Sequence, residues 1–183
     1  MTTEAERDEL IRQLTARVEA LEAQAPGDAL TLGVINGSLD HTMAALIVAI
    51  GAAVYDMQVD IFFTFWGTAA LRDPKKTAKK GFMDKMFGVM LPRGAAKLPL
   101  SHLQMLGMGP VVIKKVMEKH GAKPLEELMK DAAEMGVRVH VCTMSMDLMG
   151  IKKEELIDFP GIDYIGVGTF VDMFSHAKQC WFF

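Results

Sequence analysis

The chain has 183 residues and a mass of 20.2 kDa, half of its residues are hydrophobic, and its formal net charge at pH 7 is −3. The apolar share is enough for one main core and argues against a disordered protein. The small negative charge gives no overall attraction to phosphate polymers, so we expect no nucleic-acid partner.

The cysteines and the first residues predict a cytoplasmic protein with free thiols. Cys142 and Cys180 lie far apart, and the opening MTTEAERDEL is acidic and polar, without the pattern of a signal peptide. The uncharged run 42–55 is shorter than the roughly 20 residues that cross a bilayer, so we expect a buried helix there.

Residues 4–24 predict a short amphipathic helix. Apolar residues recur at the a and d positions of about two heptads, and neither Gly nor Pro interrupts the stretch. We expect this helix to pack on another chain; packing against its own domain is the alternative. Pro26 and Gly27 indicate a linker, so the predicted units are residues 1–27 and a domain over residues 28–183. The a and d positions are Ile11, Leu14, Val18 and Leu21.

Apolar strands and helices alternate from residue 28 onwards. Such alternation predicts a three-layer α/β/α domain in which helices cover both faces of a mainly parallel sheet. The predicted strands are residues 30–35, 59–66, 137–142 and 164–168, and the predicted helices are residues 41–55, 124–135, 152–157 and 170–181.

The middle of the chain, residues 71–120, is rich in Lys and Met and is interrupted by Gly and Pro. We expect short helices and loops inserted between two strands. The lysines are either a solvated face or a docking patch for an acidic partner or an anionic substrate. Methionines near His102 could in principle hold Cu(I), but their spacing matches no ligand set, so we expect adaptable packing residues and no metal.

Cys142 is the candidate reactive residue. It ends a predicted strand, where ligands gather in parallel sheets, and Thr143 and Ser145 can cap a following helical turn. Unpaired N–H groups at a helix start favour a thiolate and lower the pKa of the thiol. The alternative is an inert, buried last residue of the strand. Cys180 lies at helical spacing with Phe170 and Phe174, which predicts a core or subunit contact.

Several segments resemble the DsrE/DsrF/DsrH-like family. The segment MGVRVHVCTMSMDLMGI around Cys142 is similar to the family's reactive-cysteine strand and loop. The longer, Met-rich branch of the family, often labelled DsrE-like or peroxiredoxin family, shows the strongest resemblance, although no Thr and Arg motif of a peroxiredoxin pocket precedes Cys142. The other matching segments are TLGVINGSLD, IFFTFWG, KMFGVMLPRG and KKEELI, so that the resemblance spans nearly all of residues 30–170.

The resemblance implies a function in sulfur relay. Family members form homo-oligomers, commonly trimer-based, and a single cysteine accepts sulfane sulfur as a persulfide and passes it to a partner thiol. Here that cysteine is Cys142, with a rhodanese-like donor, a TusA-like acceptor and no cofactor. We therefore expect a sulfurtransferase-like persulfide carrier; whether it counts as an enzyme stays open.

Other residues are expected to position the persulfide or its partner. Asn36, Ser38 and Trp66 follow the first two strands and should share a rim with Thr143 and Ser145. Lys85 and Arg93 are expected to dock an acidic partner. The alternative function is a non-catalytic oligomeric scaffold or regulator of a sulfur-metabolism complex, with peripheral membrane contact as a variant.

Overall fold

A five-stranded parallel sheet forms the centre of the protein, in the order β4-β3-β2-β1-β5. The computed structural model describes residues 4–24 and 27–183. All strands point the same way, so that their carboxyl ends share one edge of the sheet. The strands are β1 (Gly27–Val34), β2 (Gln58–Phe63), β3 (Arg138–Cys142), β4 (Asp163–Ile165) and β5 (Ala177–Phe182).

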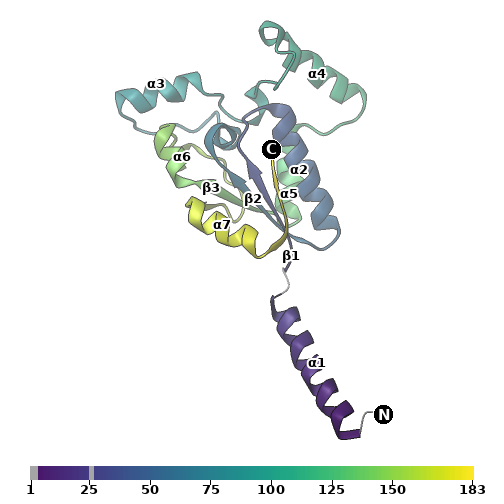
Figure 1. Cartoon of the computed structure of the whole chain (residues 1–183). Coiled ribbons are helices and arrows are strands. Elements are labelled where there is room, and N and C mark those ends of the chain that lie inside the picture. The colour runs from purple at the N-terminus through teal and green to yellow at the C-terminus, as the bar shows by residue number, and fades with distance from the viewer. Residues whose placement is uncertain (1–3, 25–26) are drawn as a thin grey trace.

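Helices cover both faces of the sheet, as the sequence predicted. Figure 1 shows α2 (Leu39–Val54) and α5 (Leu125–Glu134) on one face and α7 (Val167–Ser175) on the other. The first face carries the larger core, in which Leu32, Ile61 and Val139 pack beneath α2 and α5. Because strands of a parallel sheet are buried on both sides, their sequences are apolar over nearly every position.

The second face carries a smaller cluster made by Phe62, Cys142, Ile165 and Phe170. The rings of Phe62 and Phe170 stack with their centroids 4.4 Å apart. This pair fastens α7 to β2, and it places Cys142 in an aromatic environment.

The predicted closing helix 170–181 is wrong in its second half. Helix α7 ends at Ser175, and the chain then forms β5, which pairs with β1. The last residues include aromatics that favour β-strands, and they pair with the edge of the sheet formed by β1. Gly33 on β1 has no side chain, which leaves space for the Phe182 ring. A Cβ at Gly33 would lie 2.5 Å from the Phe182 ring. Cys180 therefore sits on an edge strand and not on a helix.

Several predicted boundaries also shift. Strand β1 begins at Gly27, so Gly27 is not part of a linker, and Pro26 lies outside the described residues. Strand β2 ends before Phe65, whose φ of 43° turns the chain into the 3-10 segment η1 (Phe65–Leu71). The predicted helix 152–157 is only the 3-10 turn η4 (Lys153–Glu155), and the predicted strand 164–168 ends at Ile165 as β4.

Two helices and several turns make up the segment over residues 71–120, at the carboxyl end of the sheet (Figure 1). The helices are α3 (Phe82–Met90) and α4 (Met108–Lys119), with 3-10 turns η2 (Ala95–Lys97) and η3 (Met105–Gly107) between them. The short α6 (Thr143–Leu148) starts directly after β3.

Helix α1 (Glu4–Gln24) projects away from the sheet in Figure 1. Its predicted seam residues Ile11, Leu14, Val18 and Leu21 have exposed fractions of 50% to 61%. The seam is therefore not packed against its own domain. No helix among the described residues combines the length and apolar character needed to cross a bilayer.

A buried carboxylate ties β2 to β3 on the second face. Asp60 accepts hydrogen bonds from Arg138 Nε and Nη2, at 2.7 Å and 2.6 Å, and pairs with His140 Nε2 at 2.8 Å. Burial opposes ionisation of Asp60, but the hydrogen bonds from His140 and Arg138 outweigh it and hold the pKa at about 2.

The exposed seam of α1 generates the first prediction. Replacing Leu14 and Val18 by Ser should weaken self-association of the full chain about tenfold or more, because the seam would bury these side chains against a second copy. Sedimentation equilibrium measures this, with Ala16→Ser and Ala20→Ser, outside the seam, as the matched control. Equal association of both double variants would contradict the expected packing.

The Asp60 network generates a second prediction. The native pKa of about 2 lies below the ordinary 3.8, so the carboxylate stabilises the fold above about pH 4 and loses that contribution as the pH falls through 2. Asp60→Asn should lower the free energy of unfolding by on the order of 2 kcal/mol at pH 7, and the difference from wild type should largely vanish near pH 2.

Urea unfolding across this pH range measures the effect. Asp172→Asn is the control, because Asp172 is an exposed carboxylate on α7 that pairs with His176, outside the Asp60 network. A pH-independent difference between Asp60→Asn and wild type would show that the network does not depend on the charge of Asp60.

Candidate functional site

The loops after β1 and β2 lie against each other at the carboxyl edge of the sheet. The Thr64 N–H donates to the Val34 carbonyl, and the Gly67 N–H donates to the Ile35 carbonyl, both at 3.0 Å. The approach is so close that a Cβ on Gly37 would lie 2.4 Å from the Trp66 carbonyl oxygen. Glycine at position 37 thus lets the two loops share one rim.

The loop after β3 joins this rim through Ser145 and Cys142. The hydroxyls of Thr64 and Ser145 are 2.8 Å apart and both are buried. Each hydroxyl has one proton to donate. One hydroxyl can therefore donate to the other, and the hydroxyl that accepts this bond can donate its own proton to the Cys142 sulfur. The three residues form one hydrogen-bonded group, which we call the thiol group.

The thiol group favours the thiolate. Burial raises the pKa of Cys142, but hydrogen bonds from the Ser145 hydroxyl and N–H, the Thr64 hydroxyl and the Met144 N–H outweigh it and lower the pKa below its ordinary value. The backbone donors belong to the first turn of α6, where N–H groups have no partner within the helix. Cys142 therefore has the electronic property of a nucleophile.

The sulfur is nevertheless covered. Only 1% of Cys142 is exposed, because Phe62, Ile165 and Phe170 pack around it. Sulfur transfer needs an accessible thiol, whereas this burial agrees with the alternative of a buried last residue of the strand. A reaction at Cys142 requires movement of this cover, which we call the aromatic cover.

Cys180 differs from Cys142 in its environment. It is half-buried on β5, where it packs against the cluster of Cys142. Burial raises the pKa of Cys180, whereas the pKa of Cys142 is lowered. Of the two thiols, Cys142 therefore has the greater tendency to ionise.

The other residues predicted for the rim differ in their exposure and in their hydrogen-bond partners. Trp66 is exposed on η1, and Thr143 is half-buried, with its hydroxyl 3.5 Å from the Ile165 carbonyl. Asn36 is exposed and its side chain accepts the Ser38 N–H at 3.0 Å, which forms a local turn. Ser38 is buried at the start of α2.

The Ser38 hydroxyl pairs with His41 Nδ1 at 2.8 Å. Its side chain therefore supports the start of the helix and is not presented to a ligand. Lys85 and Arg93 are not on this rim. They line a separate hollow with Lys79, Lys80 and Glu155, on and around α3.

Sequence reasoning missed two parts of the site. The aromatic cover was missed because Phe62 and Phe170 come from distant segments that only the fold brings together. The network of Asp60, Arg138 and His140 was also missed, although Arg138, His140 and Cys142 alternate along β3 and so share one face. That alternation is a signal that the sequence does contain.

Within the part of the chain that the structure describes, no group of three or more His, Cys, Asp or Glu side chains is placed to hold a metal ion.

Comparison with known proteins places this geometry in a family. The chain is 49% identical over 142 residues to YrkE of Bacillus subtilis, covering 77% of this chain and 88% of that protein. It is 30% identical over 149 residues to a protein of Allochromatium vinosum named sulfur carrier protein DsrE2, covering 79% and 91%.

A solved structure supports the fold assignment. The crystal structure of the ychN protein from Escherichia coli matches with a TM-score of 0.50 at 15% identity, over 85% of this chain and 99% of that one. This likeness concerns the fold alone. The sequence pattern of the DsrE/DsrF/DrsH-like family matches residues 28–182. The chain therefore belongs to the DsrE/DsrF/DrsH-like family.

Proposed function

We propose that this protein works in sulfur relay and carries sulfane sulfur as a persulfide on Cys142. The observation that carries the proposal is the thiol group, in which Thr64, Ser145 and the first turn of α6 lower the pKa of a cysteine at the end of β3. The 30% identity to a protein named as a sulfur carrier supports the same chemistry.

The transfer proceeds in two balanced exchanges. The Cys142 thiolate attacks the outer sulfur of a donor persulfide, a new S–S bond forms, the donor S–S bond breaks, and the donor leaves as a thiolate. An acceptor thiolate then attacks the same outer sulfur, and Cys142 leaves as a thiolate. No net oxidation or reduction occurs, and no cofactor is required.

The hydrogen-bond donors serve both exchanges. They stabilise negative charge on the Cys142 sulfur before the attack and again when Cys142 is the leaving group. A lowered thiol pKa therefore assists loading and unloading alike. This symmetry suits a carrier, which must release the sulfur that it has accepted.

The partners are those that the family resemblance implies, and the surface beside the thiol is suited to protein contact. Trp66 and Met144 are exposed next to the thiol group and offer an apolar contact for a second protein. We propose a rhodanese-like donor and a TusA-like acceptor, a homo-oligomeric, trimer-based assembly, and action in the reducing cytoplasm. Partner contact would also displace the aromatic cover and so speed the transfer.

The scaffold function is the second candidate. It is favoured by the 1% exposure of Cys142 and by the exposed seam of α1. Under that hypothesis Cys142 only packs on the second face of the sheet, and Cys142→Ser should leave partner binding unchanged.

Sulfur loading separates the two functions. Wild type incubated with glutathione persulfide should gain about 32 Da per sulfur atom in intact-protein mass spectrometry, and reductant should remove it. Cys142→Ser should not gain this mass, whereas Cys180→Ser should. Loading that persists in Cys142→Ser, or no loading of folded wild type from any persulfide or polysulfide donor, would contradict the carrier function.

The pKa of the thiol provides a second test. In a Cys180→Ser background, Thr64→Val and Ser145→Ala should each raise the pKa of Cys142, because each removes a hydroxyl from the thiol group. Thiolate absorbance near 240 nm, followed against pH, measures this without a reagent having to reach the buried sulfur. Thr143→Val is the matched control, since the Thr143 hydroxyl faces the Ile165 carbonyl. An unchanged titration in both thiol-group variants would rule out this account of the pKa.

A further inference from the structure

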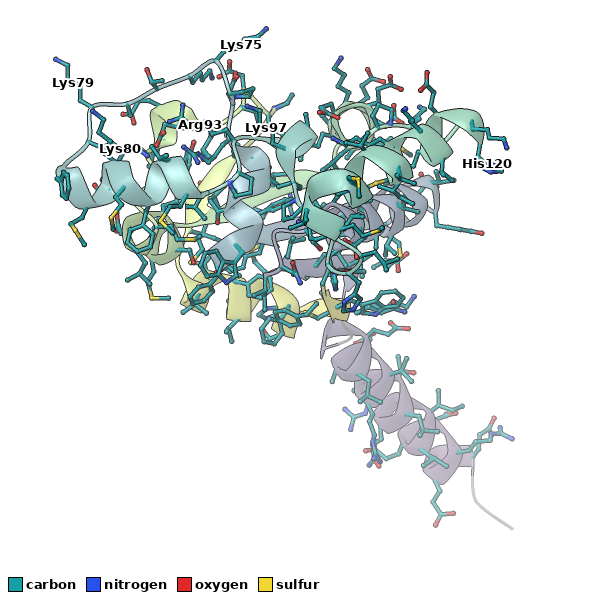
Figure 2. All side chains as sticks on the ribbon, turned by 90° about the horizontal axis from the view of Figure 1, so that it is seen from above. Lys75, Lys79, Lys80, Arg93, Lys97 and His120 are labelled. Carbon is teal, nitrogen blue, oxygen red and sulfur yellow. The ribbon has the colours of Figure 1, made fainter. Side chains whose placement is uncertain are left out.

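A basic hollow of about 410 Å³ lies between α3, the loop before it and η4. Four basic side chains and a single carboxylate line it, together with Thr77 and Ala78. Figure 2, seen from above, shows Lys79, Lys80 and Arg93 on the side of the molecule formed by α3. The charged lining residues are Lys79, Lys80, Lys85, Arg93 and Glu155.

The walls of the hollow are fixed by buried ionic contacts. Arg72 Nη1 donates to the Gly88 carbonyl at 3.1 Å and to the Leu91 carbonyl at 3.2 Å, and Nη2 donates to Glu155 at 3.3 Å. Arg72 thus joins the end of α3 to η4. Lys80 also pairs with Glu155, and only 5% of its side chain is exposed. The arrangement therefore exists before any ligand binds, which reduces the entropy cost of binding.

The positive charge of the hollow is not balanced by the protein. Glu155 is shared between Lys80 and Arg72, so one carboxylate serves two cations. Among the described residues, Lys79, Lys85 and Arg93 have no ion-pair partner. The carboxylate of nearby Asp84, in the first turn of α3, pairs instead with Lys152 at 3.6 Å.

The excess positive charge also acts on Arg72, which is buried in the wall of the hollow. Burial lowers the pKa of Arg72, Glu155 raises it, and the charge of Arg93 lowers it further. Arg93 is therefore close enough to repel Arg72. A bound anion would relieve this repulsion between cations that are gathered in a chain whose net charge is −3.

We propose that this hollow binds a small polyanion with two or more linked phosphate groups. Several unpaired cations call for several negative charges, and the volume falls in the range of small-molecule sites and exceeds what a single phosphate fills. Arg93 offers a planar fork for phosphate oxygens, and the lysines offer point charges. Lys75 and Lys97, both labelled in Figure 2, do not line the hollow.

Isothermal titration calorimetry of the full chain with tripolyphosphate, at about 0.15 M ionic strength, tests the proposal. Lys85→Gln combined with Arg93→Gln should weaken binding about tenfold or more, because two direct phosphate contacts are lost. Lys75→Gln combined with Lys97→Gln removes the same charge outside the hollow and should change the dissociation constant by less than about threefold. Thermal unfolding establishes that each variant is folded.

Further ligands identify the source of the phosphates. If ATP binds as tightly as tripolyphosphate and adenosine does not bind, the ligand is a nucleotide whose phosphates occupy the hollow. If only tripolyphosphate binds, the ligand is a free polyphosphate. Thiosulfate at equal ionic strength should bind at least about tenfold more weakly than tripolyphosphate, because it has fewer charges to pair.

Chemical acetylation of the lysines, with and without tripolyphosphate, tests the same proposal in the wild-type chain without a variant. Tripolyphosphate should protect Lys79 and Lys85 in the wild-type chain and leave Lys75 and Lys97 reactive. The proposal is overturned by the absence of binding at millimolar concentration, by equal losses in the two double variants, or by equal protection of all four lysines.

Discussion

The parallel pairing of β2 with β3 is the constraint on which the thiol group depends. Their register sets Asp60 opposite Arg138 and Phe63 opposite Val141, so the next residues along, Thr64 and Cys142, leave the sheet side by side. A slip by one residue would turn every side chain of the shifted strand to the other face, which would separate the thiol from its donors. The half-buried contact of Asp60 with Arg138 opposes such a slip, because the slip would leave the buried Asp60 carboxylate without this partner.

Cys142 combines two environments that act in opposite directions. The aromatic cover removes the sulfur from water and disfavours its charge, while the hydroxyls and N–H groups on the other side favour it. The result is a thiol that is chemically activated but sterically closed. Such a sulfur is protected from nonspecific oxidation and becomes reactive when the cover moves, which partner contact would favour.

Parallel strands bring the thiol group and the basic hollow to the same edge of the molecule. The thiol group follows β2 and β3 directly, whereas the hollow is built from the segment inserted after η1 and held by Arg72 and Glu155. Polar side chains and loops gather at the carboxyl edge because helix dipoles and strand ends converge there. The sheet core beneath both sites is apolar and continuous, so each can vary without altering the register of the strands.

Local pattern was sufficient for the α/β class, the parallel sheet and the place of Cys142 at the end of a strand, because hydrophobic periodicity reflects which faces are buried. It was insufficient for the last strand: residues 177–182 have a helical spacing of apolar side chains, and only the free edge of β1 beside Gly33 makes them a strand.

The amino-acid sequence by itself therefore determined most of the elements and the place of the candidate cysteine among them. The tertiary structure decided what surrounds that residue. Thr64 and Ser145 are 81 positions apart and Phe62 and Phe170 are further apart still. Contacts between such distant positions depend on strand order and register, which no short stretch of sequence encodes.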